Sequence, residues 1–214
     1  MLVVDDHPIV RERLAELINV EQDLVVCGEA EDGHEALQAI ETLRPDIAIV
    51  DITLKDTYGI ELIKDIHIRH PELPVLVLSM HDESLYAERA LRAGARGYLT
   101  KQEATRKVMS ALRLILDGGV YVSDKMAATF VRRVAGAKPI ARPSSSENLT
   151  NRELEIFQLI GQGMGVRDIA KGLHVSVKTV EAHRANIKEK MNFKTSAELL
   201  RYAIRCSLDE NRSE

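Results

Sequence analysis

The sequence predicts an α/β fold with a parallel sheet, followed by a small all-helical unit. Up to about residue 118, short apolar runs alternate with amphipathic segments of helical period. A stretch rich in Pro and Ser then interrupts this pattern, and only helical segments follow it. The chain has 214 residues, which is enough for two small domains of different architecture.

The first part of the chain contains candidate strands and helices in strict alternation. The strands are expected at Leu2–Asp5, Leu24–Gly28, Ile47–Val50, Val75–Ser79 and Gly97–Leu99. The helices are expected at Pro8–Asn19, Gly33–Leu43, Gly59–Arg69, Glu83–Ala93 and Ala104–Asp117. Apolar strands of this kind are buried on both faces of a sheet, and repeated βα units imply parallel pairing through right-handed crossovers. Residues 1–118 therefore predict a five-stranded, parallel, doubly wound domain.

Residues 119–148 predict a linker that contains a possible short helix at Ser123–Val134. Within it, Pro and Ser without apolar periodicity make residues 136–147 a candidate mobile segment. Residues 149–208 then predict a compact four-helix unit. Its first helix begins at a capping box formed by Thr150 and Glu153 and runs to Gly163.

Three more helices are expected in this unit. They are expected at about Val166–Leu173, from a cap at Ser176 to about Met191, and at about Ser196–Ser207. We expect the last residues, Asp209–Glu214, to be frayed.

The charge of the chain is unevenly distributed. Residues 1–148 carry 18 Lys and Arg against 24 Asp and Glu, a net charge of −6, whereas residues 149–208 carry 10 against 6, a net charge of +4. A basic second unit is compatible with nucleic-acid binding. No apolar run approaches the ~20 residues that span a bilayer, and the N-terminus does not have the pattern of a signal peptide. We therefore expect a cytoplasmic protein that does not interact with membranes.

Polar residues stand where the predicted strands end. Asp5 and Asp6 follow the first strand, Asp51 follows the third, Ser79 ends the fourth and Lys101 follows the fifth. The carboxyl ends of parallel strands share one edge of the sheet, which is where ligands bind in such folds. Three acids there repel one another unless a cation lies among them, and oxygen ligands suit Mg²⁺. The alternative is that Asp51 is only a helix or turn cap.

These residues give the chain a resemblance to the receiver domain of two-component response regulators, over residues 1 to about 118. The motifs that carry it are Val3-Val4-Asp5-Asp6-His7-Pro8, Asp51, Ser79 and the run from Gly94 to Lys101. The resemblance implies a flavodoxin-like receiver fold. It also implies that Asp51 accepts a phosphoryl group from a sensor histidine kinase.

The resemblance further implies roles for the neighbouring residues. Asp6 and Asp51 would bind Mg²⁺ directly, Asp5 would act through water, and the backbone carbonyl of Thr53 would complete the ligands. The phosphoryl group would be held by Ser79 and Lys101, while Tyr98 would be an aromatic switch that moves inward. Alternatively, Tyr98 is a half-buried strand aromatic, and we interpret His7 as structural or solvent-facing.

Two positions depart from the pattern of many receivers. Lys55 stands four residues after Asp51, where many receivers have Pro, and Gln102 stands after Lys101, where many also have Pro. Because a cis peptide bond before a residue other than proline costs about 3 kcal/mol, the second departure leaves open whether the Lys101–Gln102 bond is cis.

Residues 168–180 have the spacing of a helix-turn-helix motif, whose second helix enters the major groove. From Leu149 to His183 the chain resembles the LuxR-type DNA-binding domain, and together with the receiver this is the architecture of the NarL/FixJ class. We expect Val180, Ile187 and Met191 to be buried. Residues on the outward face or near its border are candidates for DNA contacts: Lys178, Thr179, Glu181, Ala182, Arg184, Ala185 and Lys188.

The sequence therefore predicts a DNA-binding transcriptional response regulator, switched by phosphorylation of Asp51. It would bind promoter DNA at paired half-sites as a homodimer formed on phosphorylation or DNA binding, and its only enzymatic activity would be self-dephosphorylation. One hypothesis for the switch is that the unphosphorylated receiver partly covers the recognition helix. Two rival hypotheses are a phosphatase with an Asp nucleophile and an adaptor that never binds DNA.

Overall fold

The computed structural model describes residues 1–54, 58–81, 83–135, 148–173 and 175–211. They fall into two compact units, 1–138 and 139–214, each of which is described by itself. The division between the units lies in residues 136–147. These residues, which form the predicted mobile linker, lie outside the described ranges, as do Lys55 and His174.

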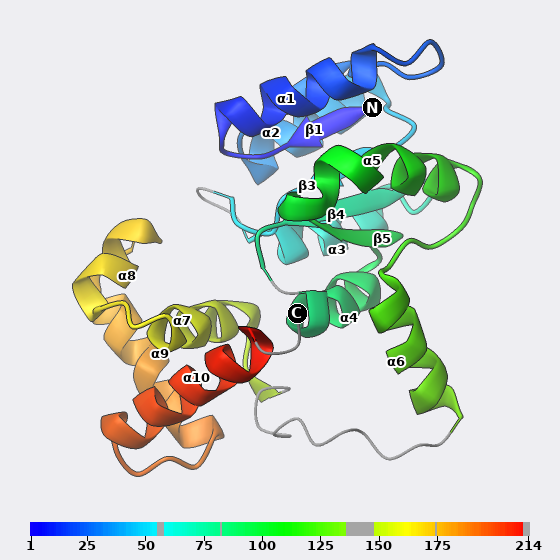
Figure 1. The fold of residues 1–214 in the computed structure, drawn as a ribbon. Helices are drawn as coiled ribbons and strands as arrows, with labels where there is room; N and C mark the ends of the chain where they lie inside the picture. Colours follow the sequence, from blue (N-terminus) through cyan, green and yellow to red (C-terminus); the bar gives the residue numbers. More distant parts are fainter. Residues whose placement is uncertain (55–57, 82, 136–147, 174, 212–214) are drawn as a thin grey trace. The chain divides into compact units, whose positions relative to one another are not determined.

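The first unit contains a parallel sheet with the strand order β2-β1-β3-β4-β5 (Figure 1). The strands are β1 (Leu2–Val4), β2 (Gly28–Ala30), β3 (Ala48–Val50), β4 (Val75–Ser79) and β5 (Gly97–Thr100). This order confirms the predicted five-stranded, doubly wound sheet. Val50 pairs with Val4 on one side and with Val77 on the other, so the three central strands end close together.

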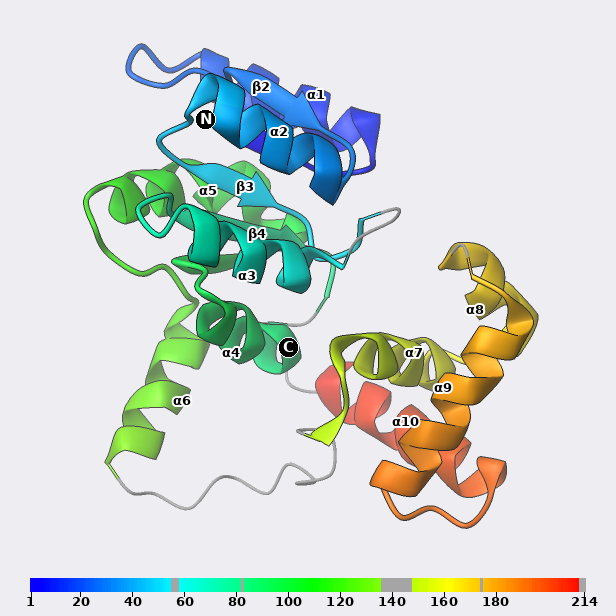
Figure 2. The same cartoon turned by 180° about the vertical axis from the view of Figure 1, so that it is seen from behind.

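Helices cover both faces of this sheet. They are α1 (Pro8–Asn19), α2 (Gly33–Leu43), α3 (Gly59–Arg69), α4 (Glu83–Ala93) and α5 (Lys101–Leu116), and α6 (Asp124–Val134) follows them. In Figures 1 and 2, α1 and α5 lie on one face and α2 and α3 on the other. A buried cluster joins the first face to its helices through residues such as Val3, Ile49, Leu14 and Val108. Successive side chains along each strand point to opposite faces of the sheet, so they pack into an apolar layer on each face.

Two predicted elements are displaced in the structure. β2 lies at Gly28–Ala30 rather than at Leu24–Gly28. Leu24 and Val26, which made the earlier stretch look like a strand, are partly buried against the core cluster. α5 begins at Lys101 rather than at Ala104, directly after β5, and the Lys101–Gln102 peptide bond is trans. The helix therefore starts at a residue that the functional site uses.

The second unit is the predicted four-helix unit. Its helices are α7 (Asn151–Gly161), α8 (Val166–Gly172), α9 (Val177–Lys190) and α10 (Ser196–Asn211). The capping box at the start of α7 is present, because Thr150 accepts from the amide of Glu153 and the Glu153 side chain accepts from the amide of Thr150. Ser176 caps α9, as predicted. The last helix continues to Asn211, beyond its predicted end at about Ser207, and residues 212–214 of the predicted frayed end lie outside the described ranges.

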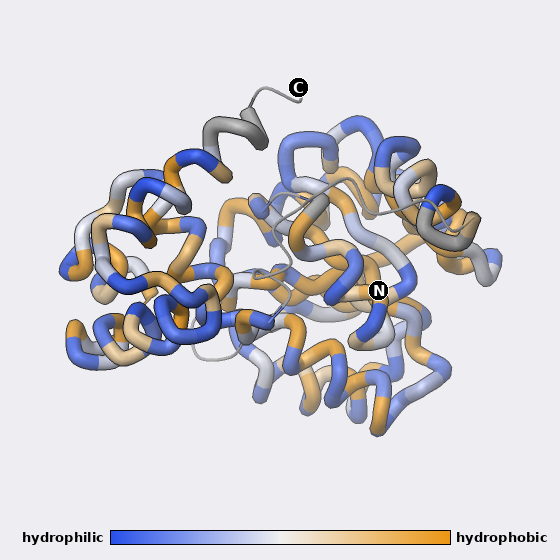
Figure 3. Tube along the Cα trace, turned by 90° about the horizontal axis from the view of Figure 1, so that it is seen from below, coloured by the Kyte–Doolittle hydropathy of each residue, from blue (hydrophilic) through white to orange (hydrophobic). Residues whose placement is uncertain are grey.

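Hydrophobic and hydrophilic residues alternate along the helices of both units (Figure 3), as amphipathic helices require. Within the described ranges, no helix is both long enough and apolar enough to cross a membrane.

Gly59 makes a close backbone contact on which the end of β3 depends. A Cβ at Gly59 would lie 2.0 Å from the carbonyl oxygen of Asp51 and 2.7 Å from the Cα of Ile52. We predict that Gly59→Ala lowers the free energy of unfolding of the first unit by about 3 kcal/mol or more, since only backbone movement relieves this overlap. Calorimetric unfolding of the full chain would measure the change.

The matched control is Gly172→Ala, because nothing lies within 4 Å of a Cβ at that helical glycine. We expect it to be neutral or slightly stabilising. An unchanged melting transition of the first unit in Gly59→Ala would contradict the prediction.

Candidate functional site

Two buried strands bring the acidic residues together. Asp5 and Asp6 follow β1, and Asp51 follows β3, which lies beside β1 in the sheet. The chain turns away from these two strands in opposite directions, so the acids lie at the point where the strand order reverses. Asp5 and Asp51 are only 2% and 3% exposed. Their charges are therefore poorly solvated.

Lys101 is the cation that faces these acids. Its Nζ lies 2.6 Å from an oxygen of Asp5 and 2.7 Å from an oxygen of Asp51. Burial lowers the pKa of Lys101, but the nearby charges of Asp51 and Asp5 outweigh it, so the pKa rises above its ordinary value. Lys101 therefore stays an ammonium at neutral pH. Its place is fixed because α5 begins at this residue.

The pKa of Asp51 is raised well above the ordinary value of a carboxyl group. Burial raises its pKa, the Lys101 charge lowers it, Asp5 raises it again, and the net value is about 6. The amide of Thr53 also donates to Asp51 Oδ1, at 3.3 Å. The ionised form of Asp51 is thus destabilised in the folded protein, and any positive charge added nearby would stabilise it.

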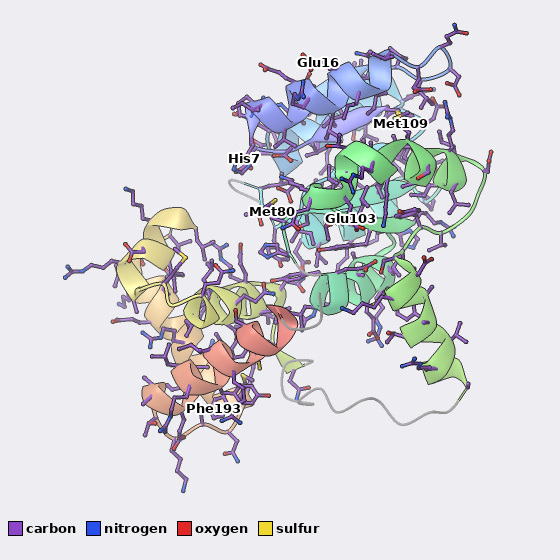
Figure 4. The ribbon with its side chains drawn as sticks, viewed as in Figure 1. His7, Glu16, Met80, Glu103, Met109 and Phe193 are labelled. Carbon is purple, nitrogen blue, oxygen red and sulfur yellow. The ribbon has the colours of Figure 1, made fainter. Side chains whose placement is uncertain are left out.

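His7 lies closer to the acids than the sequence interpretation suggested. Its ring Nδ1 is 2.6 Å from Asp6 Oδ1 and 3.2 Å from Asp5 Oδ1, and its backbone amide donates to Asp5 Oδ1 at 2.9 Å. The side chain is 64% exposed, so it is both solvent-facing and in contact with the site. Figure 4 shows His7 at the start of α1, on the side of the sheet where Met80 follows β4. The turn of the loop, which the sequence does not reveal, directs the ring to the acids.

The described residues at this edge carry more negative than positive charge. Three carboxylates, Asp5, Asp6 and Asp51, face the one ammonium of Lys101, which leaves an excess of two negative charges. Arg11 donates to the Asp5 carbonyl, but its charge is paired with Glu29. One divalent cation would balance this excess.

The donor atoms also fit such a cation. One ligand atom from each of Asp5, Asp6, His7 and Asp51 lies within 4.8 Å of the others. The buried Asp6 Oδ1 lies 2.6 Å from His7 Nδ1, but it has no hydrogen-bond partner among the described residues. Carboxylate oxygens around a buried, unsatisfied oxygen suit a hard cation such as Mg²⁺.

A hydrogen-bonded loop surrounds the predicted switch residues. Ser79 is fully buried, and its Oγ accepts from the amide of His81 at 3.2 Å. The Tyr98 hydroxyl donates to the carbonyl of His81 at 2.9 Å, and the His81 ring lies 2.9 Å from Thr53 Oγ1 and stacks on Tyr86. Tyr98 is 1% exposed, so it already lies inward and is not half-buried. His81 joins these residues, and no sequence signal singled it out.

In the second unit, α9 presents the face that its helical period predicted. Val180, Ile187 and Met191 are buried. The candidate DNA-contact residues Lys178, Thr179, Glu181, Ala182 and Ala185 are exposed, and Arg184 and Lys188 are partly buried. Asn186 is also exposed on this face, and the sequence reasoning missed it.

Ion pairs from α7 fix the direction of α9. Lys190, in the last turn of α9, lies 2.7 Å from buried Glu153 of the capping box. Arg152 donates to the carbonyl of Leu173 at the end of α8 and pairs with buried Glu155. Burial raises the pKa of Glu153, but hydrogen bonds from Lys190 and Thr150 outweigh it and lower the pKa overall. Helices α8 and α9 are thus held by contacts with α7, and the face of α9 that points away from α7 stays exposed.

Comparisons with known proteins agree with this division. Residues 1–113 match the model of the response regulator receiver domain, and residues 147–203 match the model of bacterial regulatory proteins of the luxR family. The chain is 36% identical over 215 residues to the oxygen regulatory protein NreC of Staphylococcus epidermidis, with 98% of this chain and 99% of that protein covered. It is 32% identical over 205 residues to the transcriptional regulatory protein DegU of Brevibacillus brevis, with coverage of 90% and 87%.

Solved structures give the same likeness. RcsB of Salmonella enterica serovar Typhimurium, bound to the promoter rprA in the presence of the phosphomimetic BeF₃⁻, is 25% identical with a TM-score of 0.60, and 94% of this chain and 96% of that one are covered. A structure of two RcsB dimers on two parallel DNAs has a TM-score of 0.56 at 25% identity, with coverage of 94% and 95%.

The raised pKa of Asp51 predicts a pH-dependent gain in stability when its charge is removed. The folded protein holds a proton on Asp51 up to about pH 6, whereas the unfolded chain releases it near 3.8, so ionisation destabilises the fold as pH rises through this window. We predict that Asp51→Asn raises the free energy of unfolding of the metal-free protein by about 1–3 kcal/mol at pH 7.5. The gain shrinks as pH falls toward 4.5.

Urea unfolding in a chelating buffer at several pH values measures this gain. Asp46→Asn is the matched control, because Asp46 is exposed. If Asp51→Asn and Asp46→Asn respond to pH alike, the burial of an unstable charge at Asp51 is refuted.

Proposed function

Because the chain belongs to the response regulators that join a receiver domain to a LuxR-type DNA-binding domain, we propose that Asp51 is its phosphoacceptor. The protein is a transcriptional regulator of a two-component system. Its proposed partner is a sensor histidine kinase, and its proposed place of action is the cytoplasm, where promoter DNA lies. The observation that supports Asp51 most strongly is its burial beside Lys101 in a site with excess negative charge.

The proposed cation is Mg²⁺. Asp6, Asp51 and the backbone carbonyl of Thr53 would hold it directly, and Asp5 would act through water. When bound, Mg²⁺ neutralises the carboxylates and the oxygens of an incoming phosphoryl group. This assignment is supported by the excess of two negative charges and by the unsatisfied oxygen of Asp6.

The proposed chemistry is the transfer of a phosphoryl group to a carboxylate. An oxygen of Asp51 attacks phosphorus in the phosphohistidine of the kinase, the P–N bond breaks, and the imidazole leaves as an acyl phosphate forms. Lys101, already 2.7 Å from Asp51, would pair with a phosphoryl oxygen. The Ser79 hydroxyl would donate to a second phosphoryl oxygen. To reach it, the hydroxyl would move toward the phosphoryl group, and this movement would disturb the hydrogen bond that it accepts from the His81 amide.

The rival enzymatic function finds less support. A phosphatase with an Asp nucleophile would release phosphate repeatedly and would not need a basic helix-turn-helix unit. We therefore propose that turnover at Asp51 is limited to self-dephosphorylation. The second rival, an adaptor that does not bind DNA, is disfavoured by the likeness to the RcsB–DNA structures.

DNA recognition is assigned to the exposed face of α9. Lys178 and Lys188 would pair with phosphates, as would the guanidinium of Arg184, which is only partly buried. Glu181 would accept from cytosine N4, and Asn186 has the side chain that best reads adenine. A homodimer would place two such helices on half-sites about 34 Å apart.

The phosphoacceptor assignment predicts the behaviour of a phosphoryl analogue. We expect beryllofluoride to bind the full chain only with Mg²⁺ present, and Asp51→Ala to abolish binding. Lys101→Ala should weaken binding by tenfold or more, because a buried ammonium opposite the analogue is lost. Fluorine nuclear magnetic resonance would follow the bound species.

Lys107→Ala is the matched control for Lys101, since Lys107 lies on the same helix and pairs with Glu103 away from the acids. Binding of beryllofluoride to Asp51→Ala would refute the assignment.

The DNA-binding assignment predicts two different effects on α9. Lys178→Ala should weaken binding to all sequences and reduce the slope of log affinity against log salt by about 1. Glu181→Ala should instead relax the preference at one base pair without weakening non-specific binding. Titration of genomic fragments at several salt concentrations, with and without beryllofluoride, would measure both.

Lys64→Ala provides the control, because this exposed lysine lies in the receiver and pairs with Glu61. A salt response that is flat for the wild-type protein would identify the helical unit as a protein-interaction module.

A further inference from the structure

The segment that joins α5 to α6 is attached to β5, the outer strand of the sheet. The amide of Tyr121 donates to the carbonyl of Arg96 at 2.9 Å, and the carbonyl of Tyr121 accepts from the amide of Tyr98 at 2.9 Å. These bonds form an isolated parallel bridge between Gly97 and Tyr121. A Cβ at Gly97 would lie 3.1 Å from the Cβ of Tyr121, so the glycine permits this close approach. The segment is thus hydrogen-bonded to β5 on both sides of Gly97.

The same segment is attached a second time, to α4. Glu83, in the first turn of α4, accepts from the amide of Ser123 at 2.7 Å and, through its other oxygen, from the Ser123 hydroxyl. The Ser123 hydroxyl also accepts from the amide of Met126 at 3.2 Å, so it caps the first turn of α6. One carboxylate therefore holds the start of a helix 40 residues away in the sequence.

Glu83 lies at the end of the loop that carries the switch residues. That loop begins at Ser79, whose Oγ accepts from the His81 amide. Tyr98 is bonded to this loop and to the first attachment, since its hydroxyl donates to the His81 carbonyl and its amide donates to the Tyr121 carbonyl. Hydrogen bonds among Ser79, His81 and Tyr98 thus run from the proposed phosphoryl site to Tyr121, and Glu83 follows His81 by two residues in the chain.

The alternative is that Glu83 only completes the cap at the start of α6. Two features favour a longer-range role. Both oxygens of Glu83 bind one residue on another element, and bonds to a charged acceptor are about twice as strong as neutral ones. Of the α6 side chains that the structure describes, Met126 is the one that is buried, and Val131 is 68% exposed. The buried side chain of α6 in the described ranges therefore lies in its first turn.

We propose that Glu83 and Ser123 form a positioning pair that couples the state of Asp51 to α6, from which the chain continues to the DNA-binding domain. The proposal rests on the proposed role of Asp51. When Ser79 moves toward a phosphoryl group, the loop and the first turn of α4 move with it, and Glu83 carries α6 along. Without the pair, phosphorylation still occurs but its effect on DNA binding is lost.

The experiment compares Glu83→Ala, Glu83→Gln, Ser123→Ala and the double alanine variant in the full chain. Three quantities are measured: beryllofluoride affinity with Mg²⁺, hydrogen exchange of the α6 amides, and the ratio of DNA affinities with and without beryllofluoride. We expect analogue binding to stay within about twofold of wild type, α6 exchange to rise by tenfold or more, and the DNA-affinity ratio to fall by at least about fivefold. The double variant should behave like either single one, since all break the same link.

Glu83→Gln separates this role from folding, because its amide oxygen still accepts from the Ser123 amide and should preserve part of the response. Glu88→Ala is the matched control: Glu88 lies on the same helix, pairs with Arg92, and should leave all three quantities unchanged.

A DNA response in Glu83→Ala equal to that of Glu88→Ala would overturn the positioning role alone. Loss of beryllofluoride binding in both Glu83 variants would also overturn it, since the pair would then belong to the phosphoryl site. A wild-type protein that neither binds the analogue nor changes its DNA affinity would overturn the role of Asp51, and this inference with it.

Discussion

The repulsion among Asp5, Asp6 and Asp51 is the constraint on which the receiver depends. Two strands without polar side chains, β1 and β3, hold the first and last of these acids where water scarcely reaches. Lys101 cancels only part of the charge, and the pKa of Asp51 stays near 6. A site that is unstable when empty gains most from a divalent cation and from a phosphoryl group that engages Lys101. The lower stability at this edge thus accompanies the response to both that we propose for the site.

This local instability can reach the rest of the molecule because the surrounding contacts are few and directional. Ser79, Thr53 and Tyr98 all bond to His81, by its amide, its ring and its carbonyl respectively. A displacement of the Ser79 hydroxyl therefore changes a connected set of hydrogen bonds rather than a single one. Glu83, in the first turn of α4, accepts from Ser123 at the start of α6, and under the proposed coupling it carries this displacement to α6.

Much of the fold could be predicted from the sequence because its signals are local. The strand β4 and the helices α1 to α4 have the expected bounds, and the buried stripe of α9 follows from a rotation of 100° per residue. β2 was displaced because the apolar run from Leu24 packs against the core without forming the ladder. The inward position of Tyr98, the approach of His7 to the acids, and the bonds of His81 and Glu83 depend on how loops turn in three dimensions. No periodicity or spacing in the sequence encodes those directions.

We propose above all that the unstable carboxylate of Asp51 is the group that receives the phosphoryl group. Peptide mapping by mass spectrometry, after the full chain has reacted with a small-molecule phosphodonor and Mg²⁺, tests it most directly. We expect one phosphoryl group, on the peptide that contains Asp51, and none when Mg²⁺ is removed by a chelator. A phosphoryl group on Ser79 or His7, or labelling of Asp51 that does not depend on Mg²⁺, would contradict it.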